Sequence, residues 1–133
     1  MSNIVATVSN IWAIDSLHKI GFDFCNKTIF MICLELDNCI KIGTKVKLEI
    51  SPSHIAITKN FTGLISYSNI IDATIVSINS GDILSSIELK FCNTTIETII
   101  TTTSSKEMNL KVGDNIKALL KATELSIIEV LND

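Results

Sequence analysis

Hydroxyl side chains cluster at three places in the second half of the sequence, and one lysine accompanies them. The clusters are Ser66-Tyr67-Ser68-Asn69, Thr101-Thr102-Thr103-Ser104-Ser105 and Lys121-Ala122-Thr123. An oxyanion is bound by donors that carry no full counter-charge, such as hydroxyls, main-chain amides at the start of a helix and a single ammonium. These residue types indicate an oxyanion site, although helix capping and strand solvation are the more ordinary explanation of the threonine run alone.

Sequence motifs for catalysis are absent. The chain has no G-x-S-x-G, no P-loop, no H-E-x-x-H and no glycine-rich dinucleotide turn. His18 and His54 each stand without a nearby cysteine or second histidine, which is typical of surface or loop positions. We therefore predict that the protein is not an enzyme and uses no organic cofactor.

The cysteines and the N-x-T sequons also have ordinary explanations. The four cysteines are Cys25, Cys33, Cys39 and Cys92. The C-x5-C spacing without histidine is not a zinc pattern, so we expect reduced thiols, mostly in the core, and no metal coordinated directly by side chains. The sequons begin at Asn26, Asn60 and Asn93. Because no secretory signal opens the chain, we expect these asparagines to form turns rather than carry glycans.

Composition limits the class of protein further. Of the 133 residues 47% are hydrophobic and 19% charged, the net charge is −3, and all eleven basic residues are lysines. No apolar run approaches the roughly 20 residues that span a bilayer. The chain also lacks the overall positive charge that binds the phosphates of nucleic acid. We expect a cytoplasmic, folded protein with no membrane segment and no nucleic-acid partner.

The sequence repeats once. FCNKTI at 24–29 recurs as FCNTTI at 91–96, a shift of 67, and collinear matches flank both copies. After the second FCN segment the shift becomes 70, which one three-residue insertion explains. We expect a first unit at 1–59, a linker at 60–65 and a second unit at 66–133.

Each unit has the pattern of a small β-barrel. The second unit has β-rich segments at 71–78, 83–91, 95–101, 115–121 and 125–130. Ser104-x-x-Glu107 has the form of a capping box and predicts one short helix between the third and fourth strands. Five strands with a helix at that place are the plan of an OB-like barrel. The fold class is therefore all-β, with two tandem five-stranded units, and so little core in each that we expect them to share strands with each other or with another chain.

The chain resembles the tandem Mop/TOBE domains, a molybdenum-pterin and molybdate-binding family. The family pattern runs S-A-R-N, then V/I-T-x-x-S before a helix, then G-D-x-V and K-A-S/T. Its counterparts here are Ser66-Tyr67-Ser68-Asn69, Ile100-Thr101-Thr102-Thr103-Ser104, Gly113-Asp114-Asn115-Ile116 and Lys121-Ala122-Thr123. The resemblance covers essentially the whole chain as two units.

The resemblance implies a ligand set for molybdate or tungstate. Ser66 and the Ser68–Asn69 backbone would sit at the oxyanion, and Tyr67 of the same segment belongs to the implied site. Thr101 and Ser104 would donate hydroxyls and amides. Lys121 would supply the positive charge, and Ala122 a main-chain donor. Because sites in the family lie between subunits or between units, a homo-oligomer, dimeric or trimeric, is implied.

The sequence departs from the family pattern in two ways. Ser68 stands where the family usually has arginine, which removes a fixed bidentate donor. In the first unit Leu34, Ser51 and Pro52 stand at the positions of Thr101, Lys121 and Ala122, so we interpret that unit mainly as scaffold and leave open a weaker second site.

The resemblance implies storage, homeostasis or sensing of molybdate or tungstate in the cytoplasm. The alternative is a module without a small ligand that pairs with a transporter ATPase or a DNA-binding partner.

Overall fold

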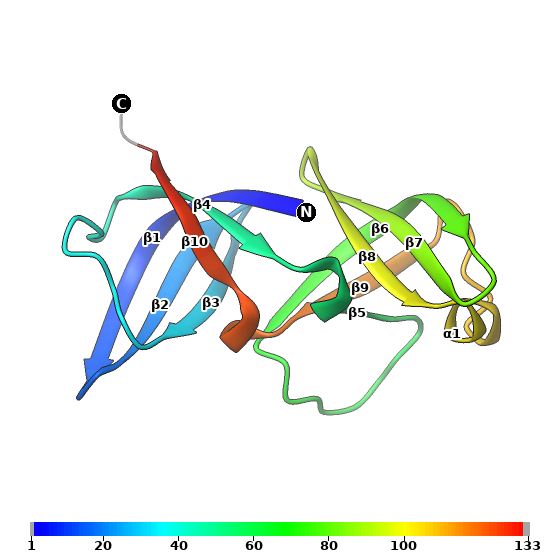
Figure 1. The fold of residues 1–133 in the computed structure, drawn as a ribbon, viewed down its shortest axis with the longest axis horizontal. Helices are drawn as coiled ribbons and strands as arrows, with labels where there is room; N and C mark the ends of the chain where they lie inside the picture. The colour runs from blue at the N-terminus through cyan, green and yellow to red at the C-terminus, as the bar shows by residue number, and fades with distance from the viewer. Residues whose placement is uncertain (1, 132–133) are drawn as a thin grey trace.

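Two five-stranded sheets lie side by side in the computed structural model, which describes residues 2–131 (Figure 1). The first sheet has the order β10-β4-β1-β2-β3 and consists of β1 (Ser2–Ile14), β2 (Leu17–Phe24), β3 (Lys27–Cys33), β4 (Lys45–Ile50) and β10 (Ser126–Leu131). The second has the order β5-β9-β6-β7-β8 and consists of β5 (Ile55–Thr58), β6 (Asn69–Ser80), β7 (Leu84–Phe91), β8 (Thr94–Thr101) and β9 (Asn115–Leu120). This confirms the predicted all-β fold of two OB-like units.

The two halves of the chain exchange one strand each. β5 belongs to the first half of the sequence but pairs with β9, with Ile55 opposite Leu120. β10 belongs to the second half but pairs with β4, with Ile127 opposite Leu48. Each exchanged strand thereby covers a sheet edge that would otherwise present unpaired main-chain groups. The expectation that the units share strands is confirmed.

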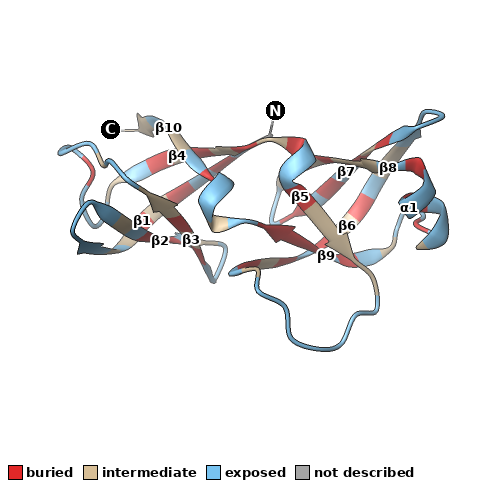
Figure 2. Ribbon diagram, turned by 60° about the horizontal axis from the view of Figure 1, so that its bottom comes forward, coloured by how far each residue is buried: buried red, intermediate tan, exposed pale blue. Residues whose placement is uncertain are grey.

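Alternating apolar residues place the core between the strands of both units. Val46, Leu48 and Ile50 of β4 are at most 1% exposed, while the two residues between them lie at intermediate depth. A residue period of two points such side chains to one face of a sheet. One hydrophobic cluster runs through both sheets, and Ile55 and Leu125, near the starts of the two exchanged strands, belong to it (Figure 2).

The repeat is preserved in backbone detail. Both β1 and β6 have a bulge, the first just after Val8 and the second just after Ile75. The amide of Gly43 donates to Val8 O at 2.7 Å, and that of Gly113 donates to Ile75 O at 2.8 Å. Both glycines have φ of 95°, a region that side chains disfavour. The same turn therefore closes on the same bulge in each unit.

The short helix α1 (Thr102–Glu107) begins earlier than the sequence predicts. The predicted capping box at Ser104 is wrong: the N-cap is Thr101, whose side chain accepts from the amide of Ser104 at 3.1 Å. The reason lies in Thr102, which is buried and donates to Gly81 O at 2.8 Å. That tertiary bond ties the helix start to the β6–β7 turn.

Two short 3-10 helices, η1 (Pro52–His54) and η2 (Ala122–Glu124), follow β4 and β9.

The FCN segments form two-residue hairpin turns that contain Asn26 and Asn93, as predicted, but each turn lies one residue earlier than the expected Asn26-Lys27 and Asn93-Thr94 pairs. Cys25, Asn26, Cys92 and Asn93 all have positive φ, between 49° and 65°. In both copies the Cys-Asn pair itself makes the turn, because Phe24 pairs with Lys27 and Phe91 with Thr94. Asparagine tolerates this left-handed conformation better than most residues.

The expectation that all cysteines are reduced is wrong for one pair. Cys25 and Cys92 form a disulfide between the two hairpin tips, with a Cα–Cα distance of 6.3 Å. The adjacent Phe24 and Phe91 rings meet edge to face at 5.4 Å between centroids. The folded chain brings these turns together from 67 residues apart, which spacing along the sequence does not reveal. Cys33 and Cys39 are free thiols, as predicted, but Cys33 is half-buried and Cys39 exposed, so the expected place in the core is wrong.

Within the described residues, none of the helices has the length and apolar character needed to cross a membrane.

The Cys25–Cys92 bond closes a loop with a sequence separation of 67 and restricts the unfolded chain. We expect the Cys25→Ser, Cys92→Ser double variant to lose about 2–4 kcal/mol in the free energy of unfolding relative to the oxidised protein, measured by urea denaturation. The matched control is Cys33→Ser, Cys39→Ser, which removes two free thiols. Equal stability of the first variant and the oxidised protein would show that the cross-link contributes nothing.

Candidate functional site

The structure divides the predicted site residues between two ends of the second sheet. Ser66, Tyr67 and Ser68 precede β6, and Asn69 pairs with Leu120, next to Lys121 and Ala122. Thr101 and Ser104 lie at the opposite end, where β8 meets α1 (Figure 1). The length of β6 separates the two groups, which corresponds to roughly 30 Å at the rise of a β-strand. Within one chain these two groups cannot contact the same small anion.

A cavity of about 220 Å³, which we call the central cavity, lies where β9 ends beside the starts of β5 and β6. Its lining residues are Ser53, His54, Ile55, Ala56, Tyr67, Lys121 and Glu124. Two of the predicted site residues, Tyr67 and Lys121, therefore lie together. The cavity also takes residues from η1 and β5, which the first half of the sequence supplies.

The charged groups of the central cavity are only partly neutralised. Within the described part of the chain, Lys121 takes part in no ion pair. The Nδ1 atom of His54 lies 3.6 Å from Oε2 of Glu124, and both side chains are about half exposed. The cavity thus offers one unpaired ammonium and one phenol hydroxyl to an anion.

Asn69 joins the two units through its side chain. Its Oδ1 accepts from the amide of Phe30 at 2.7 Å, and its Nδ2 donates to the carbonyl of Phe30 at 2.8 Å. The residue is 1% exposed, and Phe30 belongs to β3, the edge strand of the first sheet. The carboxamide therefore satisfies two main-chain groups that would otherwise lack partners. The predicted contribution of the Asn69 main chain to a ligand stays a prediction.

The hydroxyls of Thr101 and Ser104 form the cap of α1. Thr101 Oγ1 accepts from the Ser104 amide and donates to Ser104 Oγ at 2.8 Å. Both residues are exposed, so a second molecule could reach them. Capping is what these groups do within the chain, and their contact with a ligand stays a prediction.

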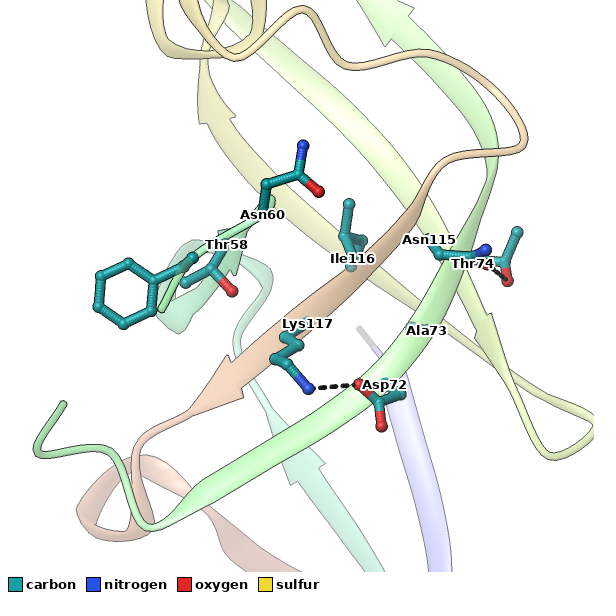
Figure 3. A pocket seen from close by; sticks show the side chains of 9 residues that line it. Thr58, Asn60, Asp72, Ala73, Thr74, Asn115, Ile116 and Lys117 are labelled. Carbon is teal, nitrogen blue, oxygen red and sulfur yellow. Dashed lines mark hydrogen bonds and ion pairs between the residues drawn. The ribbon is translucent and has the colours of Figure 1, made fainter. Parts of the chain in front are cut away.

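A second hollow, of about 380 Å³, was not anticipated from the sequence. It lies over β6 and β9 and is lined by Thr58, Asn60, Phe61, Asp72, Ala73, Thr74, Asn115, Ile116 and Lys117. Asp72 accepts from Lys117 at 2.8 Å, and the two side chains point towards each other (Figure 3). This bond, together with Lys27 at 3.4 Å, lowers the pKa of Asp72. Because the Asp72 carboxylate already pairs with the ammonium groups of Lys117 and Lys27, this hollow is a poorer anion site than the central cavity.

Sequence reasoning missed His54 and Glu124. A signal was nevertheless present, because a shift of 70 sets Ser51-Pro52-Ser53-His54 against Lys121-Ala122-Thr123-Glu124. The two turns meet at the junction of the units, where His54 pairs with Glu124. Among residues 2–131 there is no group of three or more histidine, cysteine, aspartate or glutamate side chains suited to a metal ion.

Residues 65–127 match the family model of the TOBE domain. The second unit is therefore similar to the TOBE domain, with a match over 63 of the 133 residues. The match covers the second unit, and the repeated turns and bulges extend the same framework to the first. No protein among the curated sequences matches the chain.

Solved structures place the whole chain in a known fold. A crystal structure of the cytoplasmic molybdate-binding protein ModG, with molybdate bound, superposes with a TM-score of 0.88. The similarity covers 94% of this chain and 93% of the other at 19% sequence identity. Such a likeness confirms the fold of two tandem units, including the half of the chain that lies outside the family match.

The Asn69–Phe30 contact gives a test of how the second unit is joined to the first. Asn69→Ala leaves the partly buried amide and carbonyl of Phe30 without these partners, so we expect a loss of about 2–3 kcal/mol in the free energy of unfolding, measured by urea denaturation. Asn79→Ala, at an exposed position of the same strand, is the matched control and should change little. If the two variants were equally stable, Asn69 would not be the link described.

Proposed function

We propose that this protein binds molybdate or tungstate in the central cavity. The observation that carries the proposal is the unpaired ammonium of Lys121 beside Tyr67, at the junction of two units whose fold is that of a molybdate-binding protein. Both anions are tetrahedral and carry two negative charges. One ammonium, with surrounding hydroxyls and main-chain amides, can bind such an anion through hydrogen bonds without two positive charges to match its two negative ones. Storage, homeostasis or sensing of the anion would follow from reversible binding.

The separation of the predicted ligands supports an oligomer. Thr101 and Ser104 are exposed but lie at the far end of the sheet from Lys121. A second copy of the chain could bring its own Thr101 and Ser104 to the central cavity of the first. We therefore propose a dimer or trimer in which sites lie at the interfaces. Ser68, in place of the usual arginine of the family, leaves Lys121 as the main cation of such a site.

The alternative function is an interaction module without a small ligand. The engagement of the Asn69 side chain with Phe30, and of Thr101 with Ser104, favours it, because these groups already have structural partners. This alternative predicts partner binding that does not change when molybdate or tungstate is added.

Calorimetric titration with molybdate and with tungstate tests the leading proposal. We expect binding at micromolar concentrations, and Lys121→Ala should weaken it about tenfold to a hundredfold, the worth of a charge-assisted hydrogen bond. Lys41→Ala removes the same charge from an exposed loop and is the matched control.

Absence of heat with both anions would exclude the oxyanion function and favour the interaction module. Binding that is as tight in Lys121→Ala as in Lys41→Ala would keep the function but reject the role of Lys121.

A further inference from the structure

The central cavity receives charged groups from both halves of the chain. His54 comes from η1, which follows β4, whereas Lys121 precedes η2 and Glu124 is its last residue, in the turn that follows β9. His54 and Glu124 occupy equivalent positions of the repeat, 70 residues apart, and face each other across the junction at 3.6 Å. The duplication therefore brings one turn of each unit to a single cavity.

Among the residues that line the cavity, the charged or titratable ones are His54, Lys121, Glu124 and Tyr67. β3 packs against η2, but its Lys27 pairs with Asp72, and neither Lys27 nor the free thiol of Cys33 lines the cavity. β5 has no ionisable side chain, and the segment before β6 contributes only the phenol of Tyr67. β8, which packs against η1, presents the buried Thr98, whose hydroxyl donates to Ile55 O at 2.6 Å. The one ionisable residue of β8, Glu97, is engaged by the hydroxyl of Ser86.

The charge of the cavity therefore depends on the state of one imidazole. Lys121 contributes one positive charge and Glu124 one negative charge, so they sum to zero when His54 is neutral. A protonated His54 raises the sum to one positive charge. Histidine is the side chain that ordinarily changes charge between about pH 5 and 8. This extra positive charge strengthens the binding of a dianion, because it offsets the repulsion between the dianion and the Glu124 carboxylate.

We propose that His54 is an anion-binding residue supplied by the first unit and that it couples oxyanion binding to proton uptake. The inference rests on the proposed function of the same cavity. In the protonated ring, Nδ1–H faces Glu124, which leaves Nε2–H as a donor for an oxygen of the anion. Glu124 orients the ring and limits binding when the ring is neutral. The first unit is then part of the site as well as a scaffold.

The test is calorimetric titration of the full chain with sodium molybdate at pH 6 and pH 8, in two buffers that differ in ionisation enthalpy. We expect the wild type to bind more tightly at pH 6, by up to about tenfold per pH unit, with uptake of close to one proton per anion at the higher pH. His54→Gln should bind about as weakly at both pH values as the wild type does at pH 8, and without proton uptake. Glu124→Gln should bind more tightly than the wild type at pH 8, because it removes the opposing charge.

His18→Gln replaces the other histidine of the chain, which lies in β2, and should keep the wild-type pH dependence. If the wild type binds molybdate but shows equal affinity at pH 6 and 8, or if His54→Gln keeps the pH dependence, the inference is overturned and the proposed function stands. If the wild type binds molybdate at neither pH, both fail.

Discussion

The exchange of β5 and β10 is the constraint on which the rest of the structure depends. A unit of about 60 residues buries too small a fraction of its surface to be more than marginally stable alone. β5 completes the second sheet by pairing with β9, and β10 completes the first by pairing with β4. Because the chain must cross between sheets twice, after β4 and after β9, the turns that hold η1 and η2 meet at the junction. The central cavity is a consequence of that crossing.

Equivalent residues of the repeat meet one another at this junction. Cys25 bonds to Cys92, and Phe24 packs on Phe91, each pair separated by the repeat shift of 67. His54 faces Glu124 at the second shift of 70. The first two pairs join identical residues and hold the units together. The third pair joins different residues, a histidine and a glutamate. The two units therefore contribute different charges to the junction, although they contribute identical residues to the disulfide and the ring contact.

The sequence was sufficient to predict the strands and the repeat, because apolar alternation and the FCN copies are local signals. The sharing of strands followed from the small core of each unit, although the sequence left open whether the partner would be the other unit or another chain. It was insufficient for contacts between distant segments. The Cys25–Cys92 bond, the Asn69–Phe30 link and the early start of α1 at Thr102 all depend on partners that folding brings together from elsewhere in the chain. For the same reason Lys121 could be singled out by residue type, whereas His54 became a candidate only once its place in the cavity was known.

The central claim is that the oxyanion lies in the cavity between the units, held by Lys121. Anomalous diffraction at the molybdenum edge, from crystals grown with molybdate, locates the metal atom without reference to any assumed ligand. The account predicts one strong peak per chain in the cavity bounded by Tyr67, Lys121 and His54. A peak at another place on the chain, or no peak in crystals that contain the protein and excess molybdate, would contradict it.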